Sequence, residues 1–318
     1  MIENIYKVLS ERSAPALKFY LNRRIKSGKE DPKRIKERFG ITAIPRPEGK
    51  LIWLRAASVG EAQAALILIN SINDTVATPH SFLITTGTRT SAKLMADRLP
   101  ANATHQYTPI DHPDWVQKFM NHWSPDIALW MESELWPNTL ALLKKNKIPA
   151  ALINARMSKT SFRNWHRAKA TAQSILSTFD TILCQTDEHK TFFDQLGASN
   201  VLVTDNLKYS AQPLPYDSHT LKSLQTATKD RPLWLYASTH KGEESLACAT
   251  HITLKKKHPN LLTIIVPRHP ERRDEILREC SASNLSIELR SETQTPAPTT
   301  DIYVADTLGE LGLFYKLS

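Results

Sequence analysis

Apolar residues in the first two thirds of the chain form short continuous runs that alternate with longer amphipathic stretches. The runs predict strands at residues 51–57, 81–86, 127–132, 150–156, 181–185 and 201–204. The stretches between them predict helices near residues 60–73, 90–98, 113–122, 136–146, 160–177 and 187–196. Continuously apolar strands are typical of a parallel sheet that is covered by helices on both faces. The pattern therefore predicts a doubly wound α/β domain over residues 51–212.

The pattern is interrupted at residues 210–232, which hold three prolines and no long apolar run, as in a linker. It then restarts, and the predicted elements are strands at 233–239, 261–267, 286–290 and 301–306, and helices at 242–257, at 270–282 and from Gly309 onward. This predicts two Rossmann-like domains that face each other across a cleft. Four strands and three helices make a thin doubly wound domain, so we expect the second one, 213–318, to be incomplete.

The first fifty residues differ from both domains because their apolar side chains are scattered among polar ones. Between Arg23 and Arg38, eight basic residues stand against three acidic ones. One interpretation is an amphipathic arm with a polybasic patch that faces anionic lipid. The other is an ordinary solvated helical arm, and the charge pattern alone leaves both open.

Composition narrows the partners without choosing one. The net charge of +9 favours anionic partners, such as nucleic acid, phosphorylated small molecules or an anionic membrane face. Cys184, Cys248 and Cys280 are far apart and form no CxxC pair, which argues against a zinc knuckle or a disulfide framework and fits a reducing compartment. No run of 18 or more apolar residues occurs, so no transmembrane helix is predicted.

The first candidate for chemistry is Glu61, which ends the run Ala-Ser-Val-Gly-Glu directly after a predicted strand. Small residues at a strand end let the backbone approach a ligand, and the helix that follows favours negative charge at its start. Glu61 is then either a general base at the edge of the sheet or only an acid that interacts with the helix dipole.

Two further candidates lie in the same domain. Glu132 and Glu134 follow a predicted strand, with Pro137 placed to open a helix, and paired carboxylates at a sheet edge suit acid/base work or binding of a sugar hydroxyl. A turn with a capping acid is the alternative. Lys208 follows the last strand of the domain and is either a ligand for phosphate or carboxylate or an ordinary surface lysine.

The second domain offers three strand-to-helix junctions, at residues 236–244, 266–273 and 306–311. Ser238, Thr239 and Gly242 suit an anion-binding turn, and Arg268 suits bidentate contact with phosphate or carboxylate. Three such junctions at one sheet edge are typical of a nucleotide site.

Other motifs are absent. Residues 87–93 are no P-loop because they lack the second glycine and the Gly-Lys-Ser/Thr ending, and no GxGxxG occurs. The histidines lack metal-ligand spacing, and no nucleic-acid motif is present. We therefore expect no metal, no cofactor and no nucleic-acid partner.

Eight motifs, taken in order, resemble those of 3-deoxy-D-manno-octulosonic acid (Kdo) transferases, which make the inner core of lipopolysaccharide in Gram-negative bacteria. They are WLRAASVGE, MESELWPN, LINARMSKTSFRNW, LCQTDEH, DNLKY, YASTHKGEE, VPRHPERR and DTLGEL. The resemblance implies a GT-B fold and an inverting, metal-independent transfer of Kdo from CMP-Kdo to lipid IVA. It also implies an enzyme that is peripheral or weakly anchored at the cytoplasmic face of the inner membrane.

The resemblance also implies roles for individual residues. Glu61 would be the general base, and Glu132 and Lys208 would stabilise the transition state. The remaining matches would form the donor site, which holds CMP-Kdo. They are Ser238, Thr239, Pro267, Arg268, Gly309, Glu310 and Leu311.

Three departures from the family pattern stand out. Arg55 occupies a position where the family usually has histidine, and the N-terminus is less apolar than the family's anchor. The family also continues beyond DTLGEL with a Gly-rich turn and an Asn-Pro-Leu-Glu segment that complete the CMP site, so we expect a partial form with weak donor binding. The alternatives are another GT-B nucleotide-sugar enzyme, or a catalytically incompetent basic relative that binds membranes or nucleic acid.

Overall fold

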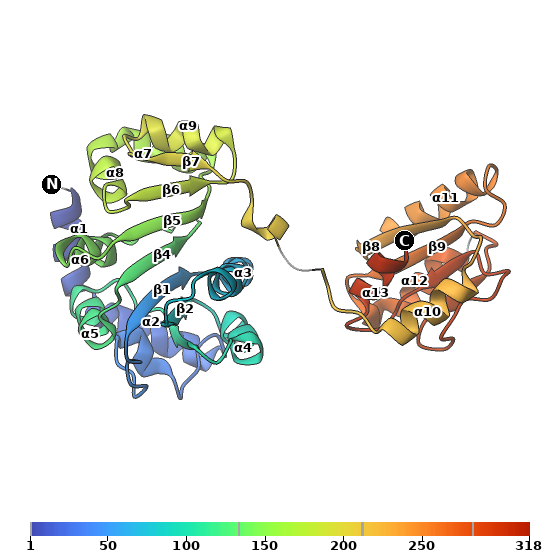
Figure 1. Cartoon of the computed structure of the whole chain (residues 1–318), viewed down its shortest axis with the longest axis horizontal. Helices are drawn as coiled ribbons and strands as arrows, with labels where there is room; N and C mark the ends of the chain where they lie inside the picture. Colours follow the sequence, from blue (N-terminus) through green and yellow to red (C-terminus); the bar gives the residue numbers. More distant parts are fainter. Residues whose placement is uncertain (1, 133, 211–212, 282) are drawn as a thin grey trace. The chain divides into compact units, whose positions relative to one another are not determined.

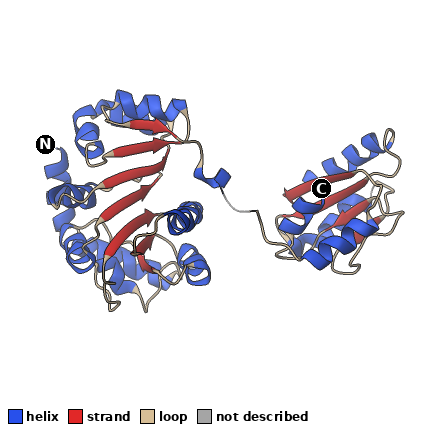
Figure 2. Ribbon diagram, viewed as in Figure 1, coloured by secondary structure: helices blue, strands red, loops and turns tan. Residues whose placement is uncertain are grey.

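The structure is a computed structural model that describes residues 2–132, 134–210, 213–281 and 283–318. It divides into two compact units, Met1–Ala211 and Gln212–Ser318. Each unit is a parallel sheet with helices on both faces (Figure 1, Figure 2). Ser133 of the Glu-Ser-Glu motif, the predicted domain boundary at 212 and the predicted helix end at 282 lie outside the described residues.

The first unit is built on a seven-stranded parallel sheet with strand order β3-β2-β1-β4-β5-β6-β7. Its strands are β1 (Lys50–Ala56), β2 (His80–Thr86), β3 (Ala103–Tyr107), β4 (Ile127–Met131), β5 (Ala150–Ala155), β6 (Thr181–Cys184) and β7 (Val201–Val203). The direction in which successive strands are added to the sheet reverses at β1, which pairs with β2 on one side and with β4 on the other. In open α/β sheets this place is the switch point, and ligands bind there beside the carboxyl ends of the strands.

Helices cover both faces of this sheet. They are α3 (Val59–Thr75), α4 (Arg89–Arg98), α5 (Pro113–Trp123), α6 (Pro137–Lys145), α7 (Lys159–Arg167), α8 (Lys169–Leu176) and α9 (Asp187–Gln195). One core lies between the sheet and α5, α6, α8 and α9, and the other lies under α3 and α4. Trp53, Trp123 and Trp130 are fully buried in the first core. Burial of one large apolar side chain contributes about 1.5–3 kcal/mol to the free energy of unfolding, so this core stabilises the positions of β1 and β4.

Strand β3 was not predicted, because Ala-Thr-His-Gln-Tyr is not an apolar run. It is an edge strand whose buried polar side chains are paired with residues far away in the sequence. The Arg34 guanidinium lies 3.1 Å from the His105 Nδ1, and the Trp123 indole donates to the Gln106 side chain at 2.7 Å. Hydrophobic periodicity does not reveal hydrogen-bond partners that are this distant in the sequence, so these polar residues did not indicate a strand.

Two other predictions were wrong in detail. The single helix expected over 160–177 is two helices, because the backbone at Ala168 departs from helical geometry between α7 and α8. The expected linker contains a helix, α10 (Ser218–Ala227), whose N-cap Asp217 accepts a hydrogen bond from the Thr220 N–H at 2.7 Å. Leu221 and Leu224 of α10 pack into the core of the second unit, so these residues belong to that unit.

The N-terminal arm folds onto the first unit. It comprises α1 (Ile2–Arg12), α2 (Ala14–Lys26) and the 3-10 helix η1 (Ile35–Phe39). The Tyr6 hydroxyl donates to Asp111, and the buried Glu30 carboxylate pairs with both Arg24 and Arg38. Among the described helices, none combines the length and the apolar character needed to cross a membrane.

The second unit has a four-stranded parallel sheet with strand order β10-β11-β9-β8. Its strands are β8 (Leu233–Thr239), β9 (Leu262–Pro267), β10 (Ile287–Leu289) and β11 (Ile302–Val304). Helices α10 and α13 (Leu311–Leu317) pack on one face, and α11 (Glu243–Lys255) and α12 (Arg273–Ser281) pack on the other.

Candidate functional site

The carboxyl ends of β1 and β4 carry two of the predicted site residues. Glu61 lies in the first turn of α3, directly after β1, and Glu132 immediately follows β4. Because these parallel strands are neighbours, their carboxyl ends meet at the same edge of the sheet. The fold therefore brings the two acids to the switch point of the sheet.

Glu61 is held by neutral donors. Its Oε2 accepts the Ala57 N–H at 2.7 Å, and its Oε1 accepts the Ser58 hydroxyl at 3.0 Å. Ser58 is also the N-cap of α3 and accepts the Glu61 N–H, so the two residues cap the helix reciprocally. Glu61 is only 6% exposed, and this burial raises its pKa, although the two hydrogen bonds oppose the shift. The charges of Glu132 and Glu134 raise the pKa of Glu61 further.

Glu132 lies between two cations. Its Oε2 accepts from the Arg156 Nε at 2.8 Å, and its Oε1 is 3.5 Å from the Lys208 Nζ. Glu132 itself is buried, and its backbone φ is +59°, a value that residues other than glycine rarely adopt. Backbone strain of this kind persists only where the surrounding structure enforces it.

Lys208 connects Glu132 to the first turn of α3. A Cβ atom placed on Gly60 would lie 3.3 Å from the Lys208 Nζ, so glycine at this position leaves room for the ammonium group. Lys208 lies on the 3-10 helix η2 (Leu207–Ser210), which the Asn154 side chain holds by accepting the Leu207 N–H at 3.0 Å. The structure thus gathers all three residues that were predicted for catalysis.

Glu134 is directed to a different partner. Its Oε2 accepts from Arg55 at 2.9 Å and from the Trp136 indole at 3.1 Å. The Arg55 guanidinium is buried between two rings, 4.7 Å from the centroid of Trp130 and 5.4 Å from that of Trp136. Burial lowers the pKa of Arg55, and the charge of Glu134 opposes that shift. The negative charge of Glu134 therefore compensates the buried positive charge of Arg55.

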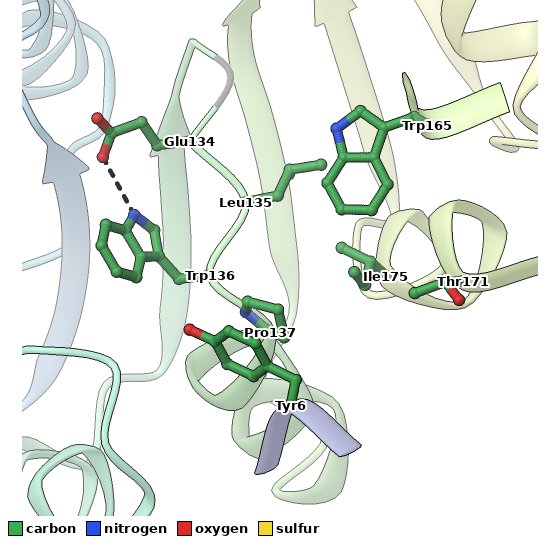
Figure 3. Close-up of a pocket in the computed structure, with 8 residues that line it drawn as sticks. All are labelled: Tyr6, Glu134, Leu135, Trp136, Pro137, Trp165, Thr171 and Ile175. Carbon is green, nitrogen blue, oxygen red and sulfur yellow. Dashed lines mark hydrogen bonds between the residues drawn. The ribbon is translucent and has the colours of Figure 1, made fainter. Parts of the chain in front are cut away.

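A pocket of about 500 Å³ adjoins Glu134 (Figure 3). Most of its walls are apolar or aromatic, and they come from α1, from the segment that precedes α6, and from α7 and α8. The lining residues are Tyr6, Glu134, Leu135, Trp136, Pro137, Trp165, Thr171 and Ile175. No residue of this pocket except Glu134 was a candidate from the sequence.

In the second unit, the junction after β8 is partly committed to internal contacts. Thr239 is fully buried, and its hydroxyl donates to Glu244 at 2.8 Å. Arg272 donates to the same carboxylate at 3.1 Å. Ser238 has a φ of +61°, and the N-cap of α11 is Gly242 in the left-handed conformation.

The other two junctions of the second unit also lie at the carboxyl ends of strands. The Arg268 N–H donates to the Thr239 carbonyl at 3.0 Å, which joins the junctions after β8 and β9, and the Arg268 side chain is exposed. Pro267 is buried at the end of β9. After β11, the two residues that precede α13 are Gly309, with a φ of +86°, and Glu310.

Glu310 pairs with Arg290 at 2.7 Å, and this hydrogen bond is the main cause that lowers the pKa of Glu310. Leu311 is the first residue of α13 and packs against the core of the second unit. Glu310 and Leu311 therefore already have partners within the unit.

Arg156 is the site residue that sequence reasoning missed. It follows β5 directly, so a search of every strand end at the edge that carries Glu132 would have found it. In the described part of the chain, no group of three or more His, Cys, Asp or Glu residues could hold a metal ion.

Comparisons with known proteins place these residues in a family. The model of the 3-deoxy-D-manno-octulosonic-acid transferase (kdotransferase) family matches residues 33–211, which is more than half of the chain. The crystal structure of UDP-GlcNAc 2-epimerase from Neisseria meningitidis bound to UDP-GlcNAc is 13% identical, with a TM-score of 0.53, covering 85% of this chain and 74% of that one. This likeness confirms the predicted α/β fold of the GT-B type.

Curated relatives show the same family. The 3-deoxy-D-manno-octulosonic acid transferase of Rickettsia bellii is 38% identical over 93% of this chain and 70% of its own length. That of Haemophilus influenzae is 34% identical over 90% of this chain and 67% of its own length. Four further Rickettsia relatives are matched over 57–58% of their length. The chain therefore belongs to the 3-deoxy-D-manno-octulosonic acid (Kdo) transferase family.

Proposed function

We propose that the chain transfers Kdo from CMP-Kdo to lipid IVA by an inverting, metal-independent displacement, in the synthesis of the lipopolysaccharide inner core. The observation that carries this proposal is the position of Glu61. It is a buried carboxylate at the switch point of the sheet, held by neutral donors and with a raised pKa. Such a group suits general-base catalysis, because a base works best when its pKa is close to the pH of the reaction.

In the proposed reaction, Glu61 takes the proton of an acceptor hydroxyl while the hydroxyl oxygen attacks the anomeric carbon of Kdo. The bond between that carbon and the phosphate oxygen of CMP breaks, and CMP leaves with the electron pair. One displacement inverts the configuration at the anomeric carbon. The Ala57 N–H and the Ser58 hydroxyl hold the Glu61 carboxylate in place without supplying a positive charge that would make it a weaker base.

Lys208 would supply the positive charge that the reaction needs. Its ammonium group lies beside the first turn of α3, where negative charge passes from the nucleophile to the departing phosphate. Glu132 accepts from Lys208 and is itself fixed by Arg156, so it keeps the ammonium group aimed at this place. A positioned cation of this kind can stabilise a phosphate leaving group in the way that a metal ion does.

The donor would be held by the second unit. The exposed Arg268 side chain and the turns at Ser238 and Gly309 are free to approach the phosphate and the nucleoside of CMP-Kdo. Thr239 and Glu310 are engaged by Glu244 and Arg290, so they would shape these turns rather than bind the donor through their charge or hydroxyl. Pro267 and Leu311 would contribute through their backbone.

The acceptor would reach the site from the cytoplasmic face of the inner membrane. The docked arm exposes apolar residues, including Val8, Leu9 and Phe19, next to a basic stretch. This combination suits peripheral binding to an anionic surface. A bis-phosphorylated lipid would bring both the anionic charge and the apolar part to which such a surface binds.

The test is Kdo transfer from freshly generated CMP-Kdo to lipid IVA by the wild-type chain and by Glu61→Gln. We expect the Glu61→Gln rate to fall by about 10²–10⁴-fold, because the base is lost while its size is kept. Glu188→Gln is the matched control, since Glu188 is an exposed acid paired with Lys159. An active Glu61→Gln variant would refute the assignment of the base. Thermal protection by UDP but not by CMP would favour a different nucleotide-sugar enzyme.

A further inference from the structure

The pocket beside Glu134 has a part that the proposed chemistry does not use. Its volume of about 500 Å³ lies in the range of small-molecule sites, and its walls are built largely of Leu135, Trp136, Trp165 and Ile175. Leu135, Trp136 and Trp165 are only partly buried. Large apolar side chains that face an open hollow are typical of a site for an apolar ligand.

The walls of this pocket are fixed in place. The Tyr6 hydroxyl donates to Asp111 at 3.1 Å, and Asp111 also accepts the backbone N–H groups of Asn138 and Thr139 at the start of α6. The Trp136 indole is oriented by its hydrogen bond to Glu134, which Figure 3 shows as a dashed line. The arm and the segment before α6 therefore form a preorganised hollow.

A neighbouring hollow shares Pro137 and Ile175 with this pocket and is lined by two lysines of α6, Lys144 and Lys145. Both lysines are exposed. Lys144 donates to the Ser177 hydroxyl, and neither lysine pairs with an acid that the structure describes. An apolar hollow beside unpaired cations is complementary to an amphiphile with an anionic head.

We propose that this pocket takes one acyl chain of the phosphorylated lipid acceptor, a proposal that rests on the proposed function. The chain segment that lines it begins two residues after Glu132, so an acyl chain bound here would anchor the acceptor beside the catalytic group. The phosphates of the head would meet Lys144 and Lys145 in the neighbouring hollow. The pocket would thus select acylated acceptors over the bare phosphorylated disaccharide.

The test narrows the pocket with Thr171→Phe. Thr171 lines the pocket from α8 and is only partly buried, so a larger ring can fill the hollow with little disturbance of the core. Ala170→Phe is the matched control, because Ala170 is the exposed neighbour of Thr171 on α8 and is not a lining residue. Thermal unfolding checks that both variants fold.

Two readouts decide the question. Direct binding of a fluorescent twelve-carbon fatty acid, below its micelle concentration, should weaken by about tenfold in Thr171→Phe and stay unchanged in Ala170→Phe. In transfer assays, Thr171→Phe should raise KM for lipid IVA by a similar factor and leave the rate with the deacylated acceptor unchanged.

Equal binding of the fatty acid by wild type and Thr171→Phe would overturn the proposal. Equal losses of transfer with acylated and deacylated acceptors would also overturn it and would assign the pocket to the sugar part. The binding readout does not depend on transfer. A chain that shows no transfer but binds the fatty acid in this pocket would therefore contradict the proposed function and still support the pocket as a site for an acyl chain.

Discussion

Glu61 and Glu244 occupy equivalent places in the two units but have different surroundings. Each lies in the first turn of the helix that follows the first strand of its sheet, Glu61 after β1 and Glu244 after β8. Each is buried. The donors to Glu61 are a backbone N–H and a hydroxyl, both neutral. Glu244 accepts from the Thr239 hydroxyl and from the charged Arg272 guanidinium.

This difference concerns how the charge of each buried carboxylate is compensated. A buried carboxylate with a cation beside it is stabilised in its charged form, so losing either partner leaves the other uncompensated. A buried carboxylate with neutral donors lacks that compensation, and burial raises the pKa of Glu61 although its two hydrogen bonds oppose the shift. The position of an acid after a strand therefore does not reveal its role, whereas the charge of its hydrogen-bond donors does.

The largest predicted effect on stability is that of Glu244→Gln. The substitution leaves Arg272 without its buried partner, and we expect the free energy of unfolding to fall by about 2–4 kcal/mol. Glu61→Gln should change it by less than about 1 kcal/mol, because the amide oxygen can still accept from a neutral donor. Urea unfolding of the full chain measures both values.

Glu243→Gln is the control for that measurement. Glu243 is the neighbour of Glu244 on α11 and, among the residues that the structure describes, accepts only from the His240 N–H, at 2.8 Å, so its substitution should be almost neutral. Equal destabilisation by Glu61→Gln and Glu244→Gln would show that the two carboxylates are held in the same way, and the comparison would fail.

The next effect concerns Lys208, the cation that stabilises the departing phosphate in the proposed mechanism. Lys208→Ala should lower the rate of Kdo transfer by about 10²–10³-fold, with little change in stability because the side chain is 43% exposed. Lys159→Ala is the control, since the Lys159 side chain is 78% exposed and pairs with Glu188 outside the site. Similar rates for the two variants would remove Lys208 from the mechanism.

Much of the first unit could be predicted from its sequence, because its strands are buried on both faces and therefore read as apolar runs. Strand β3 escaped prediction because the partners of its buried His105 and Gln106 side chains are Arg34 and Trp123, which are distant in the sequence. Helix α10 escaped because prolines on either side of it indicated a linker, although Asp217 caps it and two leucines bury it.

The site was predicted in its members but not in its pairings. Parallel strands bring their carboxyl ends together, so the positions of Glu61, Glu132 and Lys208 after strands placed them at one edge. Which acid faces which cation depends on the strand order and on local backbone geometry such as the φ of +59° at Glu132. The pairing of Arg156 with Glu132 and that of Arg55 with Glu134 became visible only in three dimensions.

A smaller effect is expected for Arg55→Lys. The planar guanidinium packs between the rings of Trp130 and Trp136, and an ammonium group cannot stack in the same way. We expect a loss of about 1–2 kcal/mol in the free energy of unfolding, measured by urea unfolding. Arg272→Lys in the second unit is the control. Among the described residues, Arg272 pairs with Glu244 but stacks on no aromatic ring, so this variant tests whether the change of cation alone accounts for the loss. A neutral Arg55→Lys would mean that the stack contributes little.

The smallest predicted effect is a shift in pH dependence. Glu61 must be ionised to act as a base, so the value of kcat/KM should fall as the pH drops through the pKa of Glu61. Burial is the main cause that raises this pKa, and the negative charge of Glu132 raises it further. Glu132→Gln removes that charge, which lowers the pKa of Glu61 and should move the acidic limb of the pH profile to lower pH.

The direction of that shift distinguishes it from simple damage to the site, because lost positioning lowers the rate at every pH without moving the limb. Glu279→Gln, an acid of the second unit that pairs with Ser245, should leave the limb where it is in wild type. An unmoved limb in Glu132→Gln would mean that a group other than Glu61 titrates there. A limb that moves to lower pH would show that the two acids at the switch point interact electrostatically.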